Sequence, residues 1–351
     1  MARKVFVGMS GGVDSSLSAA LLKEQGYDVV GVYMKNWTRD LPGFVCPWKE
    51  DYRDAKTVAV QLGIPFKVFD FETEYRQAVV DYMIDGYKQG LTPNPDIMCN
   101  QEIKFKLFLE TALKQGADMI ATGHYVRTKD GRLYKGKDDN KDQSYFLYRV
   151  SADALKHTLF PVGELSKDRV RAEAAQRQLI TATKRDSQGI CFVGEVGIKQ
   201  FLLNELGEQL PGKIIDQSGR EVGVHDGAIF YTIGQRHGLN VGGGLPYYVI
   251  DKNMHKNIVY VTTDINDVKL WSSKVDLVNP WWINAPPETG KNYLVKTRYR
   301  STSVESTVLS LTNNSLSIHL SEEVRAVSPG QSAVIYDQDQ VLGGGIILRG
   351  E

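Results

Sequence analysis

A glycine-rich loop at residues 10–16, Ser-Gly-Gly-Val-Asp-Ser-Ser, separates a predicted strand from a predicted helix. The strand is the apolar, β-branched run at residues 4–9, and the helix carries its apolar residues on one face over residues 15–25. Two consecutive glycines allow a tight turn that brings bare backbone N–H groups close to a ligand. The N-terminus of the following helix adds about half a positive charge. The loop is therefore predicted to bind phosphate.

The residues of this loop restrict which class of phosphate-binding site it can form. It lacks the lysine of the Walker motif Gly-x-x-x-x-Gly-Lys-Ser/Thr, which argues against a kinase or GTPase that grasps a γ-phosphate. A plain tight turn is the alternative to an anion site, but the polar residues on both sides of the glycines favour the anion site. Among them, Asp14 could start the helix as a capping carboxylate or help to hold Mg²⁺.

Strand and helix patterns alternate through the next hundred residues. Further strands are predicted at residues 28–33, 64–69 and 117–122, and helices at residues 50–62, 72–89 and 101–115. This alternation predicts an α/β domain with a doubly wound parallel sheet. Ligands of such sheets lie beyond the carboxyl ends of the strands. Met34, after the second strand, could cover an adenine or be a core methionine, and Gly123, after the fourth, permits close approach of a nucleotide.

The chain changes character after this first domain, which is predicted to span residues 1–206. A hairpin is predicted at residues 126–139 and further helices at residues 141–150, 166–179 and 197–206. Glycines and prolines then punctuate short β-type runs, which predicts a central β-rich domain at residues 207–275. Residues 264–287 have the composition of a connector. The remaining alternation of strand and turn predicts a C-terminal β-barrel domain at residues 276–351.

One predicted strand of the barrel alternates basic residues. Lys296, Arg298 and Arg300 would share one face, with Tyr299 on the other. An RNA-binding surface and a solvated charged strand both explain this pattern. The formal net charge is zero, so a nucleic-acid partner would need such local patches. A second basic stretch, residues 167–186, is open to the same two interpretations.

Length and cysteine content restrict the class of protein. At 351 residues the chain is too long for one compact core and should form two or three domains. No stretch has the apolar length of a membrane helix and the N-terminus has no signal-peptide core, so a cytoplasmic protein without membrane contact is expected. Three cysteines in such a chain favour a reducing compartment. No Cys-x-x-Cys pair exists, so a zinc or cysteine-ligated iron–sulfur centre is not predicted.

Cys99 and His124 are candidate reactive residues. Two prolines at residues 93 and 95 predict a rigid extended segment, and a helix from residue 101 would place Cys99 near its N-terminus. There the helix dipole lowers the pKa of a thiol. A buried, inert cysteine is the alternative, for which a position just after this loop is poor. His124 could be a catalytic base, although a lone histidine is more often structural.

Several motifs together resemble one family, the bacterial tRNA-specific 2-thiouridylases of the PP-loop ATP pyrophosphatase superfamily. The matching stretches are residues 8–15, 94–100, 123–125, 141–143, 187–192, 231–236 and 342–347. They follow the order of the family over nearly the whole chain, which is far more specific than the PP-loop alone. Departures are slight: Ile335 stands where an aromatic residue is expected, and Ser301 follows a familiar Arg-Tyr-Arg. Cys46 matches no role in the family.

The resemblance implies both a fold and an activity. The fold is a PP-loop domain, a small central domain and a C-terminal barrel. The activity is that of a sulfurtransferase, which replaces the C2 oxygen of a wobble uridine in tRNA with sulfur, uses ATP and releases AMP and pyrophosphate. ATP and its Mg²⁺ are the expected cofactors. The expected partners are tRNA, through its anticodon stem-loop, and a cysteine desulfurase or sulfur-relay protein as sulfur donor. The enzyme is expected to act as a monomer.

The family's functional residues carry over motif by motif. ATP would be held by Gly8, Met9, Ser10, Gly11, Gly12, Val13, Asp14, Ser15, Met34 and Gly123, with Asp14 serving the adenylation. The target base would face Asn94, Pro95 and Asp96. Other contacts to tRNA would come from Lys141, Asp142, Gln143, Arg298 and Tyr299. Cys191 would carry the persulfide sulfur, and Cys99 would be its partner.

This chemistry suits the residues. A uridine C2 carbonyl has no leaving group, so adenylation must first turn its oxygen into one, and the loop can stabilise the departing pyrophosphate. A persulfide on Cys191 could then attack directly, or Cys99 could release hydrosulfide from it. Either route ends in a disulfide, which requires Cα atoms within about 7 Å. The rival functions are an amidating PP-loop synthetase, which leaves both cysteines idle, an iron–sulfur thiolation enzyme, and an RNA-binding protein with structural ATP.

Overall fold

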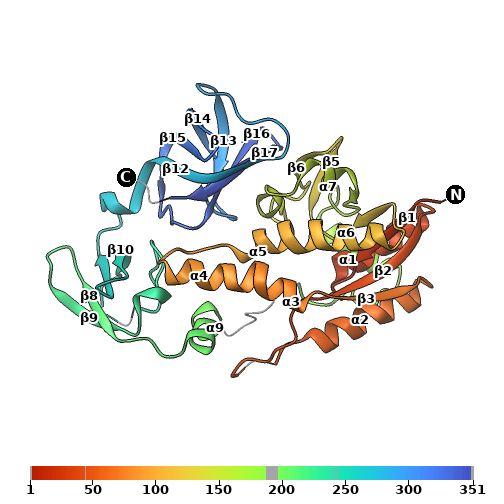
Figure 1. Ribbon diagram of the computed structural model, residues 1–351, viewed down its shortest axis with the longest axis horizontal. Coiled ribbons are helices and arrows are strands. Elements are labelled where there is room, and N and C mark those ends of the chain that lie inside the picture. The colour runs from red at the N-terminus through yellow and green to blue at the C-terminus, as the bar shows by residue number, and fades with distance from the viewer. Residues whose placement is uncertain (1, 44, 187–196, 240, 243, 349–351) are drawn as a thin grey trace.

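The computed structural model describes residues 2–43, 45–186, 197–239, 241–242 and 244–348 and arranges them in three domains (Figure 1). The first domain contains a sheet of five parallel strands in the order β3-β2-β1-β4-β7. These strands are β1 (Lys4–Gly8), β2 (Asp28–Lys35), β3 (Phe66–Asp70), β4 (Met119–Ala121) and β7 (Thr158–Leu159). The predicted parallel α/β domain is confirmed.

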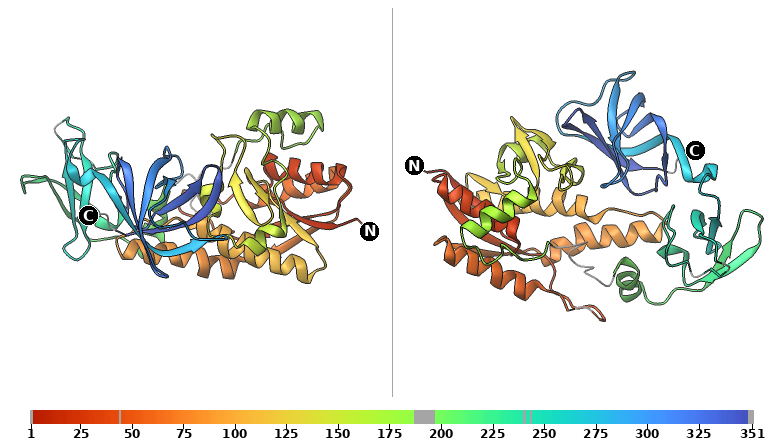
Figure 2. Two further views of the ribbon diagram at one scale, coloured as in Figure 1. Left: turned by 90° about the horizontal axis from the view of Figure 1, so that it is seen from above. Right: turned by 180° about the vertical axis from the view of Figure 1, so that it is seen from behind.

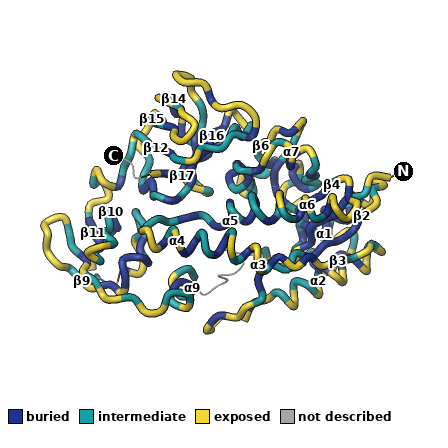
Figure 3. Tube along the Cα trace, in the orientation of Figure 1, coloured by how far each residue is buried: buried dark blue, intermediate teal, exposed yellow. Residues whose placement is uncertain are grey.

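Helices cover both faces of this sheet because side chains alternate between the faces along each strand. Val5 and Val7 of β1 belong to one hydrophobic core, and Phe6 belongs to the other. The first core is covered by α1 (Val13–Glu24), α2 (Trp48–Gln61) and α8 (Lys167–Gln176). The second is covered by α3 (Glu72–Tyr75), α4 (Tyr82–Lys88), α5 (Pro95–Met98), α6 (Phe108–Lys114) and α7 (Ala152–Lys156). This doubly wound arrangement leaves α1 largely buried (Figure 3).

One helix begins earlier than the sequence predicts. Residues 99–107 are π-helical and join α5 to α6, so a continuous helix starts at Pro95 instead of residue 101. Proline is favourable in a first turn because its missing N–H would have no helical partner there. Asn94 caps the helix by accepting a hydrogen bond from the backbone N–H of Asp96 over 3.1 Å. The prediction of an extended segment was therefore wrong from Pro95 onward.

A second expected helix, at residues 141–150, is absent from the described structure of that stretch. The hairpin before it is confirmed as β5 (Val126–Lys129) and β6 (Arg132–Lys135), but only residues 144–147 form a short 3₁₀ helix. The carboxylate of Asp142 accepts hydrogen bonds from the backbone N–H groups of Gly136 and Ser144, over 3.0 and 3.1 Å. These bonds hold the chain in a turn, which competes with a helix.

The central domain is small and mostly β-structure. Its elements are α9 (Gly197–Leu206), β8 (Gly212–Ile215), β9 (Glu221–His225), β10 (Tyr248–Asn253) and β11 (Ile258–Thr262). The strands form a sheet in the order β10-β11-β8-β9, with a core of its own. The predicted central β-rich domain is confirmed in kind. Figure 2 shows it at the end of the molecule remote from the N-terminus.

The C-terminal domain is a closed barrel of six strands. These are β12 (Trp271–Trp282), β13 (Asn292–Lys296), β14 (Val304–Leu311), β15 (Ser315–Arg325), β16 (Ser332–Asp337) and β17 (Gln340–Ile347). The predicted C-terminal β-barrel is confirmed, and pairing of β12 with β17 closes it. Half of the connector expected at residues 264–287 is instead β12, whose residues Val275 and Leu277 are fully buried in the barrel core.

The three domains contact one another. The barrel sheet extends into the hairpin of the first domain, because β17 pairs with β6. The helices α3 and α4 follow one another and run from the first sheet toward the central domain (Figure 1). α9 ends at Leu206, and β12 crosses the expected boundary between residues 275 and 276. Among the helices described, none is long and apolar enough to cross a membrane.

Candidate active site

The loop after β1 has the backbone geometry of an anion cradle. Gly11 adopts φ +76°, which favours glycine, and Gly12 is extended just before α1 begins. A Cβ atom at Gly11 would lie 2.4 Å from the carbonyl oxygen of Asp51, so only glycine fits there. The backbone N–H of Ser10 donates to the hydroxyl of Ser15 over 3.2 Å, which closes the turn onto the helix.

Residues from three strand ends meet at this loop. A Cβ atom at Gly8 would lie 2.9 Å from the Cε atom of Met34, at the end of β2. A Cβ atom at Gly123, after β4, would lie 2.7 Å from the backbone nitrogen of Ser15. The structure therefore brings together the predicted nucleotide residues from β1, β2 and β4. The side chain of Val13 is buried in the core, so it can contribute only its backbone to a ligand.

Asp14 is tightly held at the start of α1. Its carboxylate accepts a hydrogen bond from the Tyr125 hydroxyl over 2.6 Å. The ammonium of Lys167 donates to both carboxylate oxygens of Asp14 over 2.6 and 2.8 Å. Burial is the main cause that raises the pKa of Tyr125, and the neighbouring Asp14 raises it further. The Tyr125 hydroxyl therefore remains a donor at neutral pH. Asp14 thus faces a cation from another part of the chain.

Lys167 extends this contact into an ion-pair network. It lies 2.8 Å from Asp186, which also accepts from Lys141 and Arg171 over 2.7 Å each. Burial favours the neutral form of Asp186, but hydrogen bonds from Lys141 and Lys167 outweigh it and lower the pKa of this carboxyl. The basic stretch 167–186 is therefore partly internal, and neither interpretation offered by the sequence describes it fully. In the sequence, Lys167 stood out only as one residue of that basic stretch.

Cys99 is more enclosed than the sequence suggested. It lies a full turn inside the helix that starts at Pro95, and it is 5% exposed within a hydrophobic core. The effect of a helix dipole falls off beyond the first turn, so the expected position at the N-terminus was wrong. Asp96 precedes Cys99 by three residues on the same helix, and burial raises the pKa of its carboxyl. Asn94 and Pro95 form the cap and first residue of this helix.

The other two cysteines differ in what the structure describes. Cys191 lies in residues 187–196, outside the described residues, so the expected pairing of Cys99 with Cys191 is not addressed by the structure. Cys46 is buried, and its thiol donates to the carbonyl oxygen of Trp37 over 3.7 Å. Burial raises the pKa of Cys46, which keeps it a thiol at neutral pH. Cys46 therefore has the surroundings of an unreactive core residue.

His124 has the environment of a structural histidine. It is 9% exposed, packs against the rings of Phe105 and Phe160, and shares a hydrogen bond of 2.8 Å between its Nδ1 and the hydroxyl of Thr122. Burial, together with the charge of Lys104, holds the pKa of His124 well below its ordinary value. The imidazole is neutral at physiological pH, and its aromatic packing and its hydrogen bond with Thr122 favour the structural alternative.

The predicted tRNA residues fall into two groups. Asp142 is 5% exposed and its carboxylate holds the turn at residues 136–144, so its side chain has an internal role, and its expected contact with tRNA stays a prediction. The Gln143 side chain accepts from the backbone N–H of Tyr125 over 3.0 Å. Lys141 pairs with Asp186, as described above. These residues position the loop after the hairpin beside the nucleotide loop.

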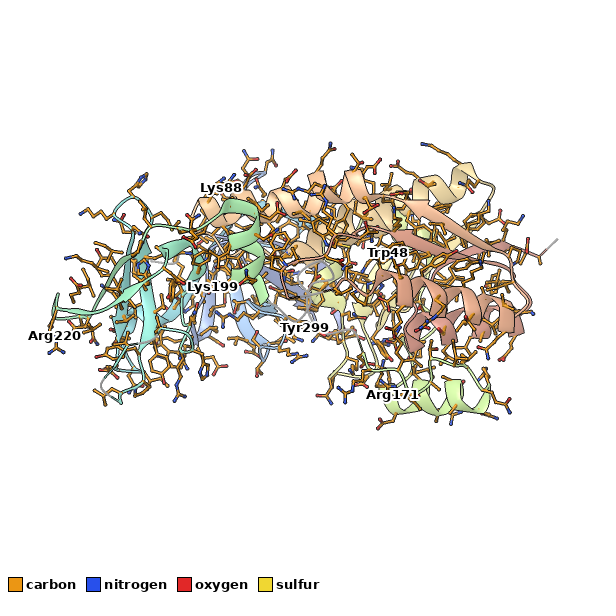
Figure 4. The ribbon with its side chains drawn as sticks, turned by 90° about the horizontal axis from the view of Figure 1, so that it is seen from below. Trp48, Lys88, Arg171, Lys199, Arg220 and Tyr299 are labelled. Atoms are coloured by element: carbon orange, nitrogen blue, oxygen red, sulfur yellow. The ribbon has the colours of Figure 1, made fainter. Side chains whose placement is uncertain are left out.

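The second group lies at the junction of the barrel with the first domain. β13 ends at Lys296, so Arg298 and Tyr299 lie in the following turn, not on a strand face as predicted. The ring of Tyr299 lies 4.3 Å from that of Phe146, and Figure 4 places Tyr299 between the two domains. Arg298 donates to the Ser328 hydroxyl over 2.9 Å and to the carbonyl oxygen of Ile233 over 3.3 Å. Arg298 thus joins the barrel to the central domain.

A cavity of about 710 Å³ opens where the three domains meet. Its walls include Thr92 from the first domain, Lys252 from the central sheet and Trp271 from the start of the barrel. Lys252 donates to the carbonyl oxygen of Tyr231 over 2.7 Å, and burial lowers its pKa to about 8. Its wall residue Thr92 lies two positions before Asn94, the first of the residues predicted to face the base.

Fold and site define the class: a PP-loop nucleotide-binding protein with an added β-rich domain and a closed barrel, and its loop geometry supports ATP binding. Family models cover each domain. They are described as tRNA methyl transferase HUP domain, residues 3–195, tRNA methyl transferase PRC-barrel domain, residues 199–263, and Aminomethyltransferase beta-barrel domain, residues 272–347.

Curated relatives identify the particular family. The chain is 48% identical to the tRNA-specific 2-thiouridylase MnmA of Bacillus subtilis (strain 168), over 98% of this chain and 94% of the relative. It is 48% identical to the protein of the same name from Bacillus cereus (strain ATCC 14579), with the same coverage. The chain belongs to the tRNA-specific 2-thiouridylase family. A solved 4-thiouridine synthetase–RNA complex with bound ATP aligns at TM-score 0.39 and 16% identity, over 55% of this chain and 45% of that chain.

Proposed function

We propose that this protein is an ATP-dependent tRNA 2-thiouridylase that adenylates the C2 oxygen of a wobble uridine and replaces it with sulfur. The observation that carries the proposal is the meeting of Gly8, Met34 and Gly123 around the PP-loop, in a chain 48% identical to curated 2-thiouridylases. An amidating PP-loop enzyme would also need the loop. It would not need Cys99 and Cys191, which both lie in stretches that resemble the 2-thiouridylase family.

The nucleotide step follows from the loop. Backbone N–H groups at residues 10–15 and the N-terminus of α1 would receive the phosphates, and as fixed donors they would stabilise the departing pyrophosphate. Met34 would lie against the adenine, with Gly123 leaving room for the nucleotide. The tRNA uridine oxygen would attack the α-phosphorus, giving an adenylated base and pyrophosphate. AMP would then be the leaving group at C2.

Asp14 is the residue that fits Mg²⁺. Protein sites for this ion use one or two carboxylates and the substrate's phosphates, and Asp14 is a partly exposed carboxylate at the start of the PP-loop helix. When bound, the ion would neutralise charge on the phosphates. Within the described part of the chain there is no cluster of three candidate ligands, which is consistent with a metal that arrives with the nucleotide.

The sulfur step needs two thiols. The terminal sulfur of a Cys191 persulfide would attack C2, expel AMP and leave the base joined to Cys191 through a disulfide bond. The Cys99 thiolate would then attack the Cys191 sulfur, which releases 2-thiouridine and forms a Cys99–Cys191 disulfide. Alternatively, Cys99 would attack the persulfide first and release hydrosulfide as the nucleophile. Cellular thiols would reduce the disulfide in either case.

The remaining parts of the proposal concern partners and surroundings. Asn94, Pro95 and Asp96 would face the target base, while Lys141, Gln143, Arg298 and Tyr299 would border the tRNA. A cysteine desulfurase or a sulfur-relay protein would load Cys191. We place the enzyme in the cytoplasm, acting as a monomer, with domain limits near residues 196 and 270.

The test of this function is direct detection of the product. The purified protein, ATP, Mg²⁺, unmodified tRNA and a persulfide donor should yield 2-thiouridine in nuclease-digested tRNA, identified by mass spectrometry. Cys191→Ser should abolish the product while tRNA binding is retained. Full activity of Cys191→Ser would overturn the proposal. Incorporation of nitrogen from ammonia in place of sulfur would favour the amidating alternative.

A further inference from the structure

Lys167 occupies an unusual position for a lysine. Its residue exposure is 8%, and it is the single lysine classed as buried in the part of the chain that the structure describes. Its backbone N–H donates to Asp138 over 2.9 Å, which fixes the start of α8. Its ammonium lies between two carboxylates, Asp14 and Asp186, and 5.6 Å from the ring centre of Tyr125. A buried cation is stable only with such partners.

The two carboxylates belong to different parts of the chain. Asp14 is a residue of the PP-loop motif, whereas Asp186 ends the segment Thr181–Asp186. Asp186 also has Lys141 and Arg171 as partners, while for Asp14 the described ion pair is with Lys167 alone. Without Asp14, Lys167 would keep only Asp186, which it shares with other cations. Its ammonium could then take a second anion as partner. A phosphate oxygen beside the PP-loop is an anion of the right kind to fill it.

The same segment touches the other side of the PP-loop. Lys184 forms ion pairs with Asp51 and Asp54 of α2, over 2.8 and 2.6 Å. The carbonyl oxygen of Asp51 is the atom that a side chain at Gly11 would strike. Residues 181–186 are therefore tied to both ends of the phosphate-binding loop, through Lys184 to the glycine side and through Asp186 and Lys167 to Asp14.

We propose that Lys167 is a nucleotide-binding residue that couples nucleotide occupancy to residues 181–186. Without nucleotide, Lys167 holds Asp14 and Asp186 together. When ATP with Mg²⁺ binds, Asp14 turns to the metal, and Lys167 keeps Asp186 and takes a phosphate oxygen as its second partner. The proposal rests on the proposed function in so far as that function supplies ATP as ligand.

The test combines nucleotide affinity with hydrogen exchange. Affinities of the full chain for ATP and AMP are measured by calorimetry, with Mg²⁺ and with chelator. Lys167→Met should weaken binding of ATP with Mg²⁺ by about tenfold or more, as expected for loss of a charged hydrogen bond, and should leave AMP binding nearly unchanged. Lys167→Arg should restore part of the ATP affinity. In the wild type, ATP with Mg²⁺ should slow amide exchange in residues 181–186, and Lys167→Met should remove this protection.

Arg171→Met is the matched control, since Arg171 contacts Asp186 but has no described contact with Asp14. It should keep ATP affinity close to that of the wild type. Melting curves establish that each variant folds, and the neutral substitute Lys167→Gln is used if Lys167→Met does not fold. Wild-type ATP affinity and retained protection in folded Lys167→Met, or in its neutral substitute, would overturn this inference alone. Failure of the wild type to bind ATP would remove the proposed function together with it.

Discussion

Leu133 in the hairpin of the first domain pairs with Val341 in the last strand of the barrel, so one sheet runs through two domains. Both side chains are fully buried. Arg127 adds an ion pair to Asp339 across the same junction, over 2.6 Å. The barrel is therefore held against the PP-loop domain by backbone pairing, apolar packing and charge. Unfolding of either domain should expose this surface on the other.

This junction gives a stability prediction. Leu133→Ala should lower the free energy of unfolding by about 2–5 kcal/mol, because a fully buried leucine is replaced by a cavity. Urea titration followed by tryptophan fluorescence measures the change. Leu113→Ala, at a half-exposed position of α6, is the control and should cost no more than about 0.5 kcal/mol. Equal losses in the two variants would contradict the described packing.

The PP-loop gives a prediction about backbone geometry. Gly11→Ala should abolish ATP binding, because Gly11 combines φ +76° with a clash of 2.4 Å against a backbone oxygen. Gly26→Ala is the matched control: Gly26 has φ +86°, but no atom lies within 4 Å of the added Cβ. It should cost about 1–2 kcal/mol in stability and leave ATP affinity unchanged. Normal ATP binding by Gly11→Ala would refute the assigned loop geometry.

The junction of Tyr299 with Phe146 gives a prediction about RNA. If Tyr299 borders the bound tRNA, Tyr299→Ala should weaken tRNA binding about tenfold, in the range of a lost base–aromatic contact. Arg220→Ala removes a cation from the exposed hairpin tip far from Tyr299 (Figure 4) and should have little effect. Filter binding at one fixed salt concentration compares them. A larger loss for Arg220→Ala would move the RNA surface to the central domain.

The cysteines give a prediction about the order of sulfur transfer. Cys99→Ser should still accept sulfur on Cys191 from a persulfide donor but should form no 2-thiouridine. Cys46→Ser is the control, because Cys46 is a buried thiol with a raised pKa and should be dispensable for thiolation. Mass spectrometry of the intact protein and of digested tRNA reports both steps. Loss of sulfur loading in Cys99→Ser would contradict the division of roles.

Lys252 gives a prediction about pH. Its pKa is about 8 in the folded protein and near 10.5 when unfolded, because burial disfavours the charged form. Between these values the unfolded chain binds more protons, so this group makes stability rise with pH from about 8 to 10.5. The total rise is of the order of 3 kcal/mol. Lys252→Met should remove this rise. The free energies of unfolding of the wild type and of Lys252→Met are measured across that pH range, and their difference should change with pH. A constant difference would show that Lys252 is not desolvated.

Local patterns predicted the sheet and the nucleotide loop well, because they depend on neighbouring residues. The run at residues 4–9 became β1, and Gly11 adopted the backbone angle that its motif requires. The helix start at Pro95 was missed because one capping contact from Asn94 outweighed the extended preference expected around two prolines. The turn at Asp142 was missed for a similar reason, since its bonds reach back to Gly136.

Long-range contacts were beyond the sequence patterns. Lys167 and Asp14 are 153 positions apart, and no local periodicity indicates that they meet. The burial of Cys99 likewise depends on packing of separate helices and strands into one core. The strand β12 was read as a connector because tryptophans and prolines flank its alternating core residues. Charge and turn residues therefore indicated candidate site residues but not their contact partners.

The most direct test of the proposed function follows the fate of ATP. The protein is incubated with α-labelled ATP and Mg²⁺, with and without unmodified tRNA, and the labelled product is separated by chromatography. We predict labelled AMP that appears only when tRNA is present, because the α-phosphate must pass through the adenylated uridine. Labelled ADP, or no turnover with intact unmodified tRNA, would contradict adenylation of tRNA and with it the proposed function.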